Sequence, residues 1–139
     1  MKDPYSLQRF VEAQGPVFEE VLSELRRGRK TGHWMWFIFP QIQGLSRSQT
    51  ARKFSISSLA EAEEYVSHAI LGPRLRECTR LVNLVHGRSI EEIFGNPDDI
   101  KFRSSMTLFV HATPDNAGFK EALQKYFDGE FDPLTVERL

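Results

Sequence analysis

The stretch "DDIKFRSS", residues 98–105, concentrates groups that could bind and process a phosphorylated compound. Within eight residues it holds two carboxylates, two cations and two hydroxyls: Asp98, Asp99, Lys101, Arg103, Ser104 and Ser105. We interpret the cations and hydroxyls as ligand-binding groups, and either carboxylate as a catalytic base that activates water. In the structural alternative, the two carboxylates cap the positive end of a helix and repel an anion there.

A second stretch, "RKTGHWMWFIFPQIQG" (residues 29–44), places positive charge beside a dense aromatic run. We interpret Lys30 as a phosphate ligand, and His33 and Gln41, which bracket the apolar run, as further ligand contacts. Two tryptophans two positions apart lie ~200° apart on a helix, so they cannot share a face. We expect Trp36 to form the floor of a pocket, where stacking of a base on the ring contributes ~1–3 kcal/mol to binding. The alternative is that the whole run fills the core.

These groups predict a pocket for a phosphorylated nucleotide- or sugar-like metabolite. Cleavage of an N-glycosidic bond is the reaction to test first, because a carboxylate can orient water and stabilise an oxocarbenium-like transition state. This hypothesis requires the two stretches to meet in space. The alternative is a non-catalytic protein-interaction module, in which the aromatic run is core and the "RRGRK" loop (residues 26–30) contacts an acidic partner.

Several other kinds of site find no support in the sequence. It contains no GxGxxG, P-loop or HExxH motif. The four histidines are widely scattered, with no pair at the spacing of metal ligands on a helix. We therefore expect neither a metal nor a cofactor. Cys78 is the only cysteine and falls on an apolar helix stripe, which predicts a buried, unreactive thiol.

The composition bounds the class of protein and its partners. A chain of 139 residues with 40% hydrophobic residues fits one domain, residues 1–139, with a packed core. The net charge of −1 provides no global attraction to nucleic acid or to an anionic membrane, so we expect neither partner. The sequence indicates no particular protein partner. It shows no signal peptide and no long apolar run, so we expect a cytoplasmic protein.

Caps and hydrophobic stripes predict an all-α fold of about six to eight short helices. The stop and start signals place helices at residues 6–14, 16–28, 46–54, 58–68, 72–87, 89–95, 96–113 and 116–129, and residues 132–139 start a final turn. Ser58 with Glu61, and Ser89 with Glu92, have the spacing of capping boxes. Asn96 is the expected N-cap of the helix that carries "DDIKFRSS". The run "HWMWFIF" could be a strand, but its residues favour a short buried helix.

Four segments together resemble one family over nearly the whole chain: "RFVEAQ", "ELRRGRKTGHWMWFIFPQIQGL", "HAILGPRLREC" and "FGNPDDIKFRSSMTLF". The sequence resembles the uncharacterised bacterial family called domain of unknown function 1810, whose members are sometimes labelled calpastatin. The resemblance implies a compact, mostly α-helical domain and supplies no reaction. A calpastatin-like disordered inhibitor would not carry so many aromatic residues. The order of motifs is also similar to that of NADAR domains, which are associated with ADP-ribose-derived metabolites.

Overall fold

The computed structural model describes residues 3–139, and regular secondary structure in this range is helical. The helices are α1 (Gln8–Gln14), the 3-10 turn η1 (Gly15–Val17), α2 (Phe18–Arg26), α3 (Met35–Ile38), α4 (Gln49–Lys53), α5 (Leu59–Ser67), α6 (Leu71–Asn83), α7 (Ile90–Phe94), α8 (Asp98–Ala112), α9 (Ala117–Phe127) and α10 (Pro133–Glu137). The predicted all-α class is confirmed. Six of the α-helices have seven or more residues, and the other four have four or five.

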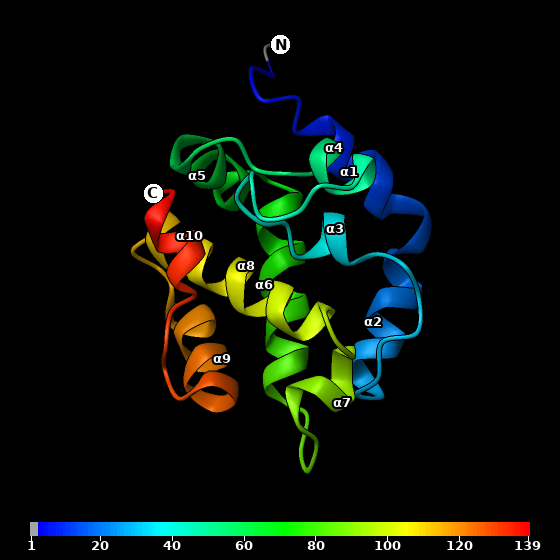
Figure 1. Ribbon diagram of the computed structural model, residues 1–139. Coiled ribbons are helices and arrows are strands. Elements are labelled where there is room, and N and C mark those ends of the chain that lie inside the picture. The colour runs from blue at the N-terminus through cyan, green and yellow to red at the C-terminus, as the bar shows by residue number, and fades with distance from the viewer. Residues whose placement is uncertain (1–2) are drawn as a thin grey trace.

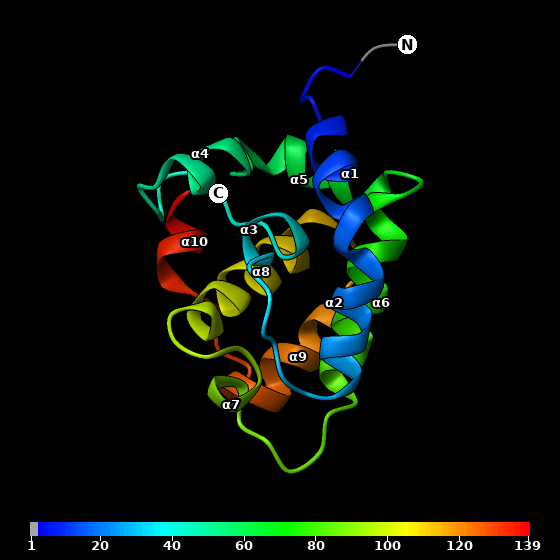
Figure 2. The same cartoon turned by 90° about the vertical axis from the view of Figure 1, so that its right-hand side faces the viewer.

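Helix α8 runs through the middle of the molecule, between helices from both ends of the chain (Figures 1 and 2). It packs against α5, α7, α9 and α10. Residues 104–110 are buried without interruption, so every face of this part of the helix meets protein. Such a helix cannot shift without disturbing its neighbours, and it therefore holds the side chains of its first turns in fixed positions.

The aromatic run forms part of the core around α8. Trp34 and Phe39 are almost completely buried, and Phe39 meets the ring of Phe102 edge-on, with centroids 5.0 Å apart. Phe94 stacks on Phe102 at the same centroid separation. Only four residues of the run, Met35–Ile38, are helical. The prediction of a short buried helix rather than a strand is confirmed.

One of the predicted caps forms completely, one forms in part, and one is wrong. Ser89 and Glu92 form a reciprocal capping box. The Ser58 hydroxyl accepts a hydrogen bond from the Glu61 N–H. The Glu61 carboxylate, however, accepts from the N–H of Ser57 instead of that of Ser58, so the reciprocal bond of the box is missing. Asn96 is not the N-cap of α8, because that position belongs to Pro97.

The misplaced Asn96 cap has a simple cause in the backbone. The N–H of Asp99, which an Asn96 cap would bind, is already bonded to the carbonyl of Gly95 at 2.9 Å. The Asn96 amide instead donates to the Asp99 carboxylate at 3.2 Å.

In the described part of the chain, no helix is long and apolar enough to cross a membrane.

Candidate functional site

A cleft of about 770 Å³ opens between α3, residues 41–47, α4, the first turn of α8 and the end of α10. Trp36 and Phe39 of the aromatic run contribute apolar wall, and Gln41 contributes a side-chain amide. The charged residues of the lining are Arg47, Arg52, Lys101, Glu137 and Arg138. Four cations therefore face one carboxylate, in a protein whose net charge is only −1. Such a local excess attracts anions in spite of the near-neutral chain.

Two extended segments of the cleft wall are joined by an isolated parallel β-bridge between Ile42 and Ile56. The N–H of Ile56 donates to the carbonyl of Gln41, and the N–H of Gln43 donates to the carbonyl of Ile56, both at 2.8 Å. Because Ile42 and Ile56 are also buried, this short bridge is shielded from water. It sets the spacing between the residues that precede α4 and those that follow it.

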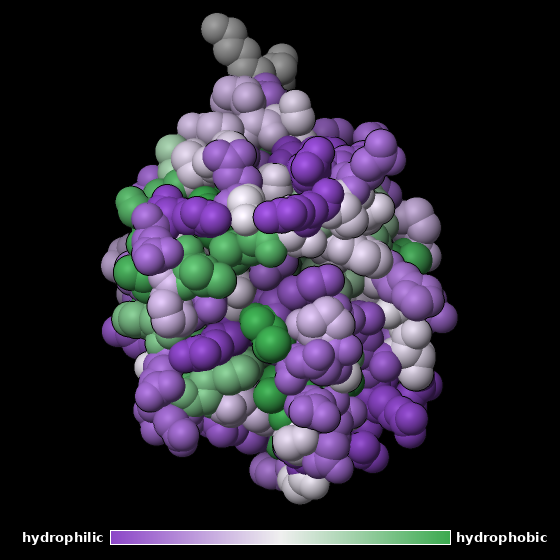
Figure 3. Space-filling model, viewed as in Figure 1, coloured by the Kyte–Doolittle hydropathy of each residue, from purple (hydrophilic) through white to green (hydrophobic). Residues whose placement is uncertain are grey.

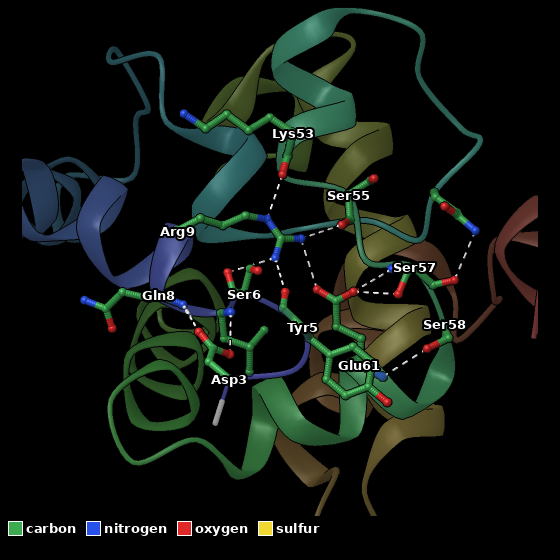
Figure 4. Close-up of polar contacts among 12 residues, drawn as sticks. Asp3, Tyr5, Ser6, Gln8, Arg9, Lys53, Ser55, Ser57, Ser58 and Glu61 are labelled. Carbon is green, nitrogen blue, oxygen red and sulfur yellow. Dashed lines mark hydrogen bonds and ion pairs between the residues drawn. The ribbon is translucent and has the colours of Figure 1, made fainter. Parts of the chain in front are cut away.

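Arg9 of α1 anchors the second of these segments from outside the cleft (Figure 4). Its guanidinium donates to the carbonyls of Lys53 at 2.7 Å and Ser55 at 2.9 Å, and forms an ion pair with Glu61 at 3.0 Å. The buried Glu61 carboxylate also accepts the N–H and hydroxyl of Ser57. Ser55 and Ser57 both line the cleft, so this network positions one of its walls.

Lys101 is the residue that joins the two stretches singled out in the sequence. Its ammonium group lies 5.4 Å from the centroid of the Trp36 ring and 3.6 Å from the carboxylate of Asp98. Asp98 in turn pairs with Lys30 at 2.8 Å. The two stretches therefore meet in space, as the pocket hypothesis requires. Lys101 contributes the cleft's only cation from α8.

The predicted residues divide between the cleft and its surroundings. Trp36, Gln41 and Lys101 line the cleft. Lys30 lies behind it, 9% exposed, and donates to the carbonyl of Gly32 as well as to Asp98. His33 is exposed on the loop before α3.

The later part of "DDIKFRSS" points away from the cleft. Arg103 donates to the carbonyls of Glu130 and Phe131, which ties the loop before α10 to α8. Ser104 donates to the carboxylate of Asp132 at 3.1 Å. Ser105 is fully buried, and its hydroxyl forms no hydrogen bond within residues 3–139. Arg103 and Ser104 therefore link α8 to the segment that leads into α10, whereas Ser105 is buried without such a contact.

The two predicted catalytic carboxylates also lie outside the lining. Asp99 is buried, and its carboxylate accepts hydrogen bonds from the Asn96 amide and from the N–H of Ile100. Asp98 lies 3.6 Å from the ammonium group of Lys101, which lines the cleft. Glu137 is the carboxylate that lines the cleft itself.

A buried carboxylate that the sequence did not reveal shapes the loop before the aromatic run. Glu24 of α2 accepts the N–H groups of Thr31 and Gly32 and the indole N–H of Trp34, at 2.7 to 3.0 Å. Burial acts to raise the pKa of Glu24, but the hydrogen bonds from Gly32, Thr31 and Trp34 outweigh it and lower the pKa below its ordinary value of 4.5. An ionised Glu24 thus holds the loop that carries Lys30.

The three arginines of the cleft were missed by sequence reasoning. Arg47 lies just before the N-cap of α4, and Arg52 lies in the last turn of this helix. Arg138 follows α10. Their residue types were visible, since "SRSQTARK" holds three cations within eight residues. Nothing in the local pattern shows that this segment and the end of α10 lie beside Trp36, because that proximity depends on the tertiary fold.

A smaller hollow of about 320 Å³ adjoins the cleft and shares Gln41, Ser46 and Lys101 with it. Its other lining residues are mostly apolar and include Ile100 and Leu134, which are both more than half exposed. Hydrophobic residues gather over α10 on the left of the face in Figure 3. The cleft is thus bordered by apolar surface on the side of α8 and α10.

Comparisons place this arrangement among proteins without an assigned activity. The family model described as Protein of unknown function (DUF1810) matches residues 4–139. The crystal structure of the conserved hypothetical protein Rv1873 from Mycobacterium tuberculosis is similar, with 59% sequence identity and a TM-score of 0.98. That similarity covers 99% of this chain and 98% of the other. No curated protein matches the chain.

Proposed function

The chain belongs to the DUF1810 family of proteins of unknown function, and we propose that its cleft binds a phosphorylated nucleotide- or sugar-like metabolite. The observation that carries the proposal is the position of Lys101, whose ammonium lies 5.4 Å from the Trp36 ring inside a cleft of about 770 Å³. This volume falls within the range of small-molecule sites. A phosphate bound by Lys101 would place the ring attached to it close to Trp36.

The phosphate end of the ligand would lie among the cations of the lining. Lys101 and the guanidinium groups of Arg47, Arg52 and Arg138 provide the positive charge. Arginine is well suited to this task, because its planar group can give two parallel hydrogen bonds to a phosphate. Asp98 does not cancel the charge of Lys101, because it is also paired with Lys30.

The ring of the ligand would use the apolar surface beside these charges. Trp36 is partly exposed, and the Lys101 ammonium lies over its ring, so a ligand ring would stack on the part of the indole that Lys101 leaves uncovered. Ile100 and Leu134 of the adjoining hollow extend this surface. Gln41 lines both the cleft and the hollow, and its amide can donate to and accept from a base or a sugar hydroxyl.

Cleavage of an N-glycosidic bond remains the reaction to test within this proposal. It needs a carboxylate near the sugar to orient water and stabilise positive charge at the reacting carbon. Glu137 lines the cleft and Asp98 is paired with Lys101, a lining residue, so these two carboxylates are the candidates to test. Replacing each with the amide separates them, because the catalytic one is needed for turnover but not for binding.

Calorimetric titration with nucleoside phosphates, sugar phosphates and ADP-ribose tests the binding proposal. ADP-ribose is included because of the resemblance to NADAR domains. We expect at least one of these compounds to bind the wild-type protein and to bind Lys101→Met at least about tenfold more weakly, as expected for one charge-assisted hydrogen bond. Lys120→Met on α9 removes the same charge from an exposed site outside the cleft and should leave binding unchanged.

The interaction-module alternative makes the opposite prediction for the same titration. It places the partner at the "RRGRK" loop, where Arg26, Arg27 and Arg29 are exposed. Binding of no phosphorylated compound, or equal binding by wild type and Lys101→Met, would favour that alternative over a ligand-binding cleft.

A further inference from the structure

We infer that the cleft selects ligands carrying two linked phosphoryl groups, such as a diphosphate, over ligands carrying one. This inference rests on the proposed function, since it specifies the charged part of the ligand for the same cleft. It assigns the selection to Arg47 and Arg52, whose side chains are exposed and are not bonded to any residue of the described range 3–139.

The first support is the balance of charge in the lining. Arg47, Arg52, Lys101 and Arg138 exceed the single carboxylate of Glu137 by three positive charges. A phosphoryl monoester carries a charge of about −1.5 to −2 near pH 7. One such group leaves part of the excess unpaired, whereas a second phosphoryl group adds the missing negative charge. A diphosphate is therefore the better electrostatic match.

The second support is the state of the individual cations. Lys101 forms an ion pair with Asp98, and Arg138 donates a hydrogen bond to the carbonyl of Gly44 at 3.3 Å. Arg47 and Arg52 differ from them, because neither side chain forms a hydrogen bond or ion pair with any residue of the range 3–139. Two exposed guanidinium groups on one wall are thus available for phosphate oxygens that Lys101 does not bind.

The third support is the origin of the four cations in the fold. Arg47 precedes the N-cap of α4 and Arg52 lies in its last turn, whereas Lys101 lies on α8 and Arg138 follows α10. The wall that carries Arg47 and Arg52 is held by the Ile42–Ile56 bridge. The cations come from three places in the fold: α4 and the residues before it, α8, and the end of α10. They can surround an extended anion better than a compact one, because each can bind a different phosphoryl group.

Gly44 adds a constraint on the side of Arg138. Its φ of +93° suits glycine, and a Cβ at this position would lie 3.0 Å from Nε of Arg138. Glycine here lets the guanidinium lie directly against the backbone of residues 41–47. This contact places the Arg138 guanidinium at the edge of the cleft, where the side chain remains exposed.

The test compares inorganic phosphate with pyrophosphate, and AMP with ADP, by calorimetric titration of the full chain at a constant ionic strength of about 0.15 M. We expect pyrophosphate and ADP to bind at least about tenfold more tightly than phosphate and AMP, because 1.4 kcal/mol, or roughly one additional charge-assisted hydrogen bond, corresponds to tenfold. Arg47→Ala/Arg52→Ala should reduce this preference to about threefold or less. Both residues are exposed, and a thermal melt verifies that the variant folds.

The matched control is Arg26→Ala/Arg27→Ala, which removes two exposed arginines at the end of α2. It changes the net charge equally and should keep the full preference for two phosphoryl groups. Equal affinity for AMP and ADP in the wild type would overturn this inference while leaving the proposed function intact. A preference that survives Arg47→Ala/Arg52→Ala would also overturn it. Failure of all four compounds to bind would count against this inference, and the proposed function would then depend on the sugar phosphates.

Discussion

Lys30, Asp98 and Lys101 form a chain of charged residues that leads from the aromatic stretch to the cleft. Asp98 lies between the two lysines, with the shorter contact, 2.8 Å, to Lys30. The function we infer for Lys30 is therefore indirect. By neutralising Asp98 it leaves Lys101 free to bind an anion, and it does not contact the ligand itself.

This arrangement predicts two effects of Lys30→Met. The variant should lose about 1–3 kcal/mol of unfolding free energy, because the partly buried Asp98 loses its nearest partner. Asp98 should then hold Lys101 more strongly and weaken phosphate binding several-fold. Urea denaturation and calorimetric titration measure the two effects. Asp98→Asn is the complementary variant, and weaker phosphate binding in it would contradict the role given to Lys30.

At this scale, three of the residues that line the cleft could be identified from the sequence. Trp36, Gln41 and Lys101 were identified because aromatic, amide and cationic groups stood out in two short stretches. Lys30 and Arg103 were identified for the same reason, but their charges bind protein groups, Asp98 and the carbonyls that precede α10. Residue type alone cannot distinguish a free cation from one that is used within the fold.

At the scale of elements, the loop between α2 and α3 depends on one ionised side chain. Glu24 accepts three hydrogen bonds from this loop, and they hold its pKa below 4.5 in the folded chain. A lowered folded-state pKa means that the carboxylate stabilises the fold above pH 4.5, and that this contribution is lost as the pH falls through the folded-state value.

We therefore expect the unfolding free energy of the wild type to fall more steeply below about pH 4.5 than that of Glu24→Gln. Thermal melts of both proteins between pH 7 and pH 3 measure the difference. Glu121→Gln on α9, which changes an exposed carboxylate, provides the control and should follow the wild-type curve. Parallel curves for the wild type and Glu24→Gln would show that Glu24 does not hold the loop.

The link between α1 and the wall after α4 is the second element-scale dependence. Arg9→Met should reduce the unfolding free energy by about 2–4 kcal/mol, because it leaves the buried Glu61 carboxylate without its ion pair. Arg9→Met/Glu61→Gln should recover part of this loss. A double-mutant cycle by urea denaturation measures the coupling, and a value near zero would contradict the anchoring role.

Helices with strong local signals were predictable, and the arrangement of the walls was not. The Ser89–Glu92 box and the buried helix α3 follow from short-range chemistry. The Glu61 carboxylate was assigned to a cap, yet it bonds Arg9 and Ser57, because a partner 52 residues away competes with the local donor. Contacts of this kind determine the cleft, and a local pattern does not encode them.

At the scale of the whole molecule, a central helix surrounded by aromatic rings should make the core difficult to open. Cys78 lies within this core with no exposed surface. Burial raises the pKa of its thiol to about 12, which agrees with the unreactive thiol expected from the sequence. Its reactivity therefore reports on opening of the whole fold.

We expect no reaction of Cys78 with 5,5′-dithiobis(2-nitrobenzoic acid) in the native protein at pH 8, and complete reaction in urea. The absorbance of the released thiolate measures both. Rapid labelling of the native chain would show that the core around α6 and α8 opens readily, contrary to the packing described.

The central claim is that a phosphorylated ligand binds beside Trp36, and a nuclear magnetic resonance titration tests it most directly. The protein has two tryptophans, so its ¹⁵N–¹H spectrum contains two indole signals. Trp36→Phe identifies the signal of the cleft, and the buried Trp34 provides an internal control. With ADP as the ligand, we predict a saturable shift of the Trp36 signal and little change at Trp34. An unchanged Trp36 signal at millimolar ADP, and likewise with the sugar phosphates, would contradict the account.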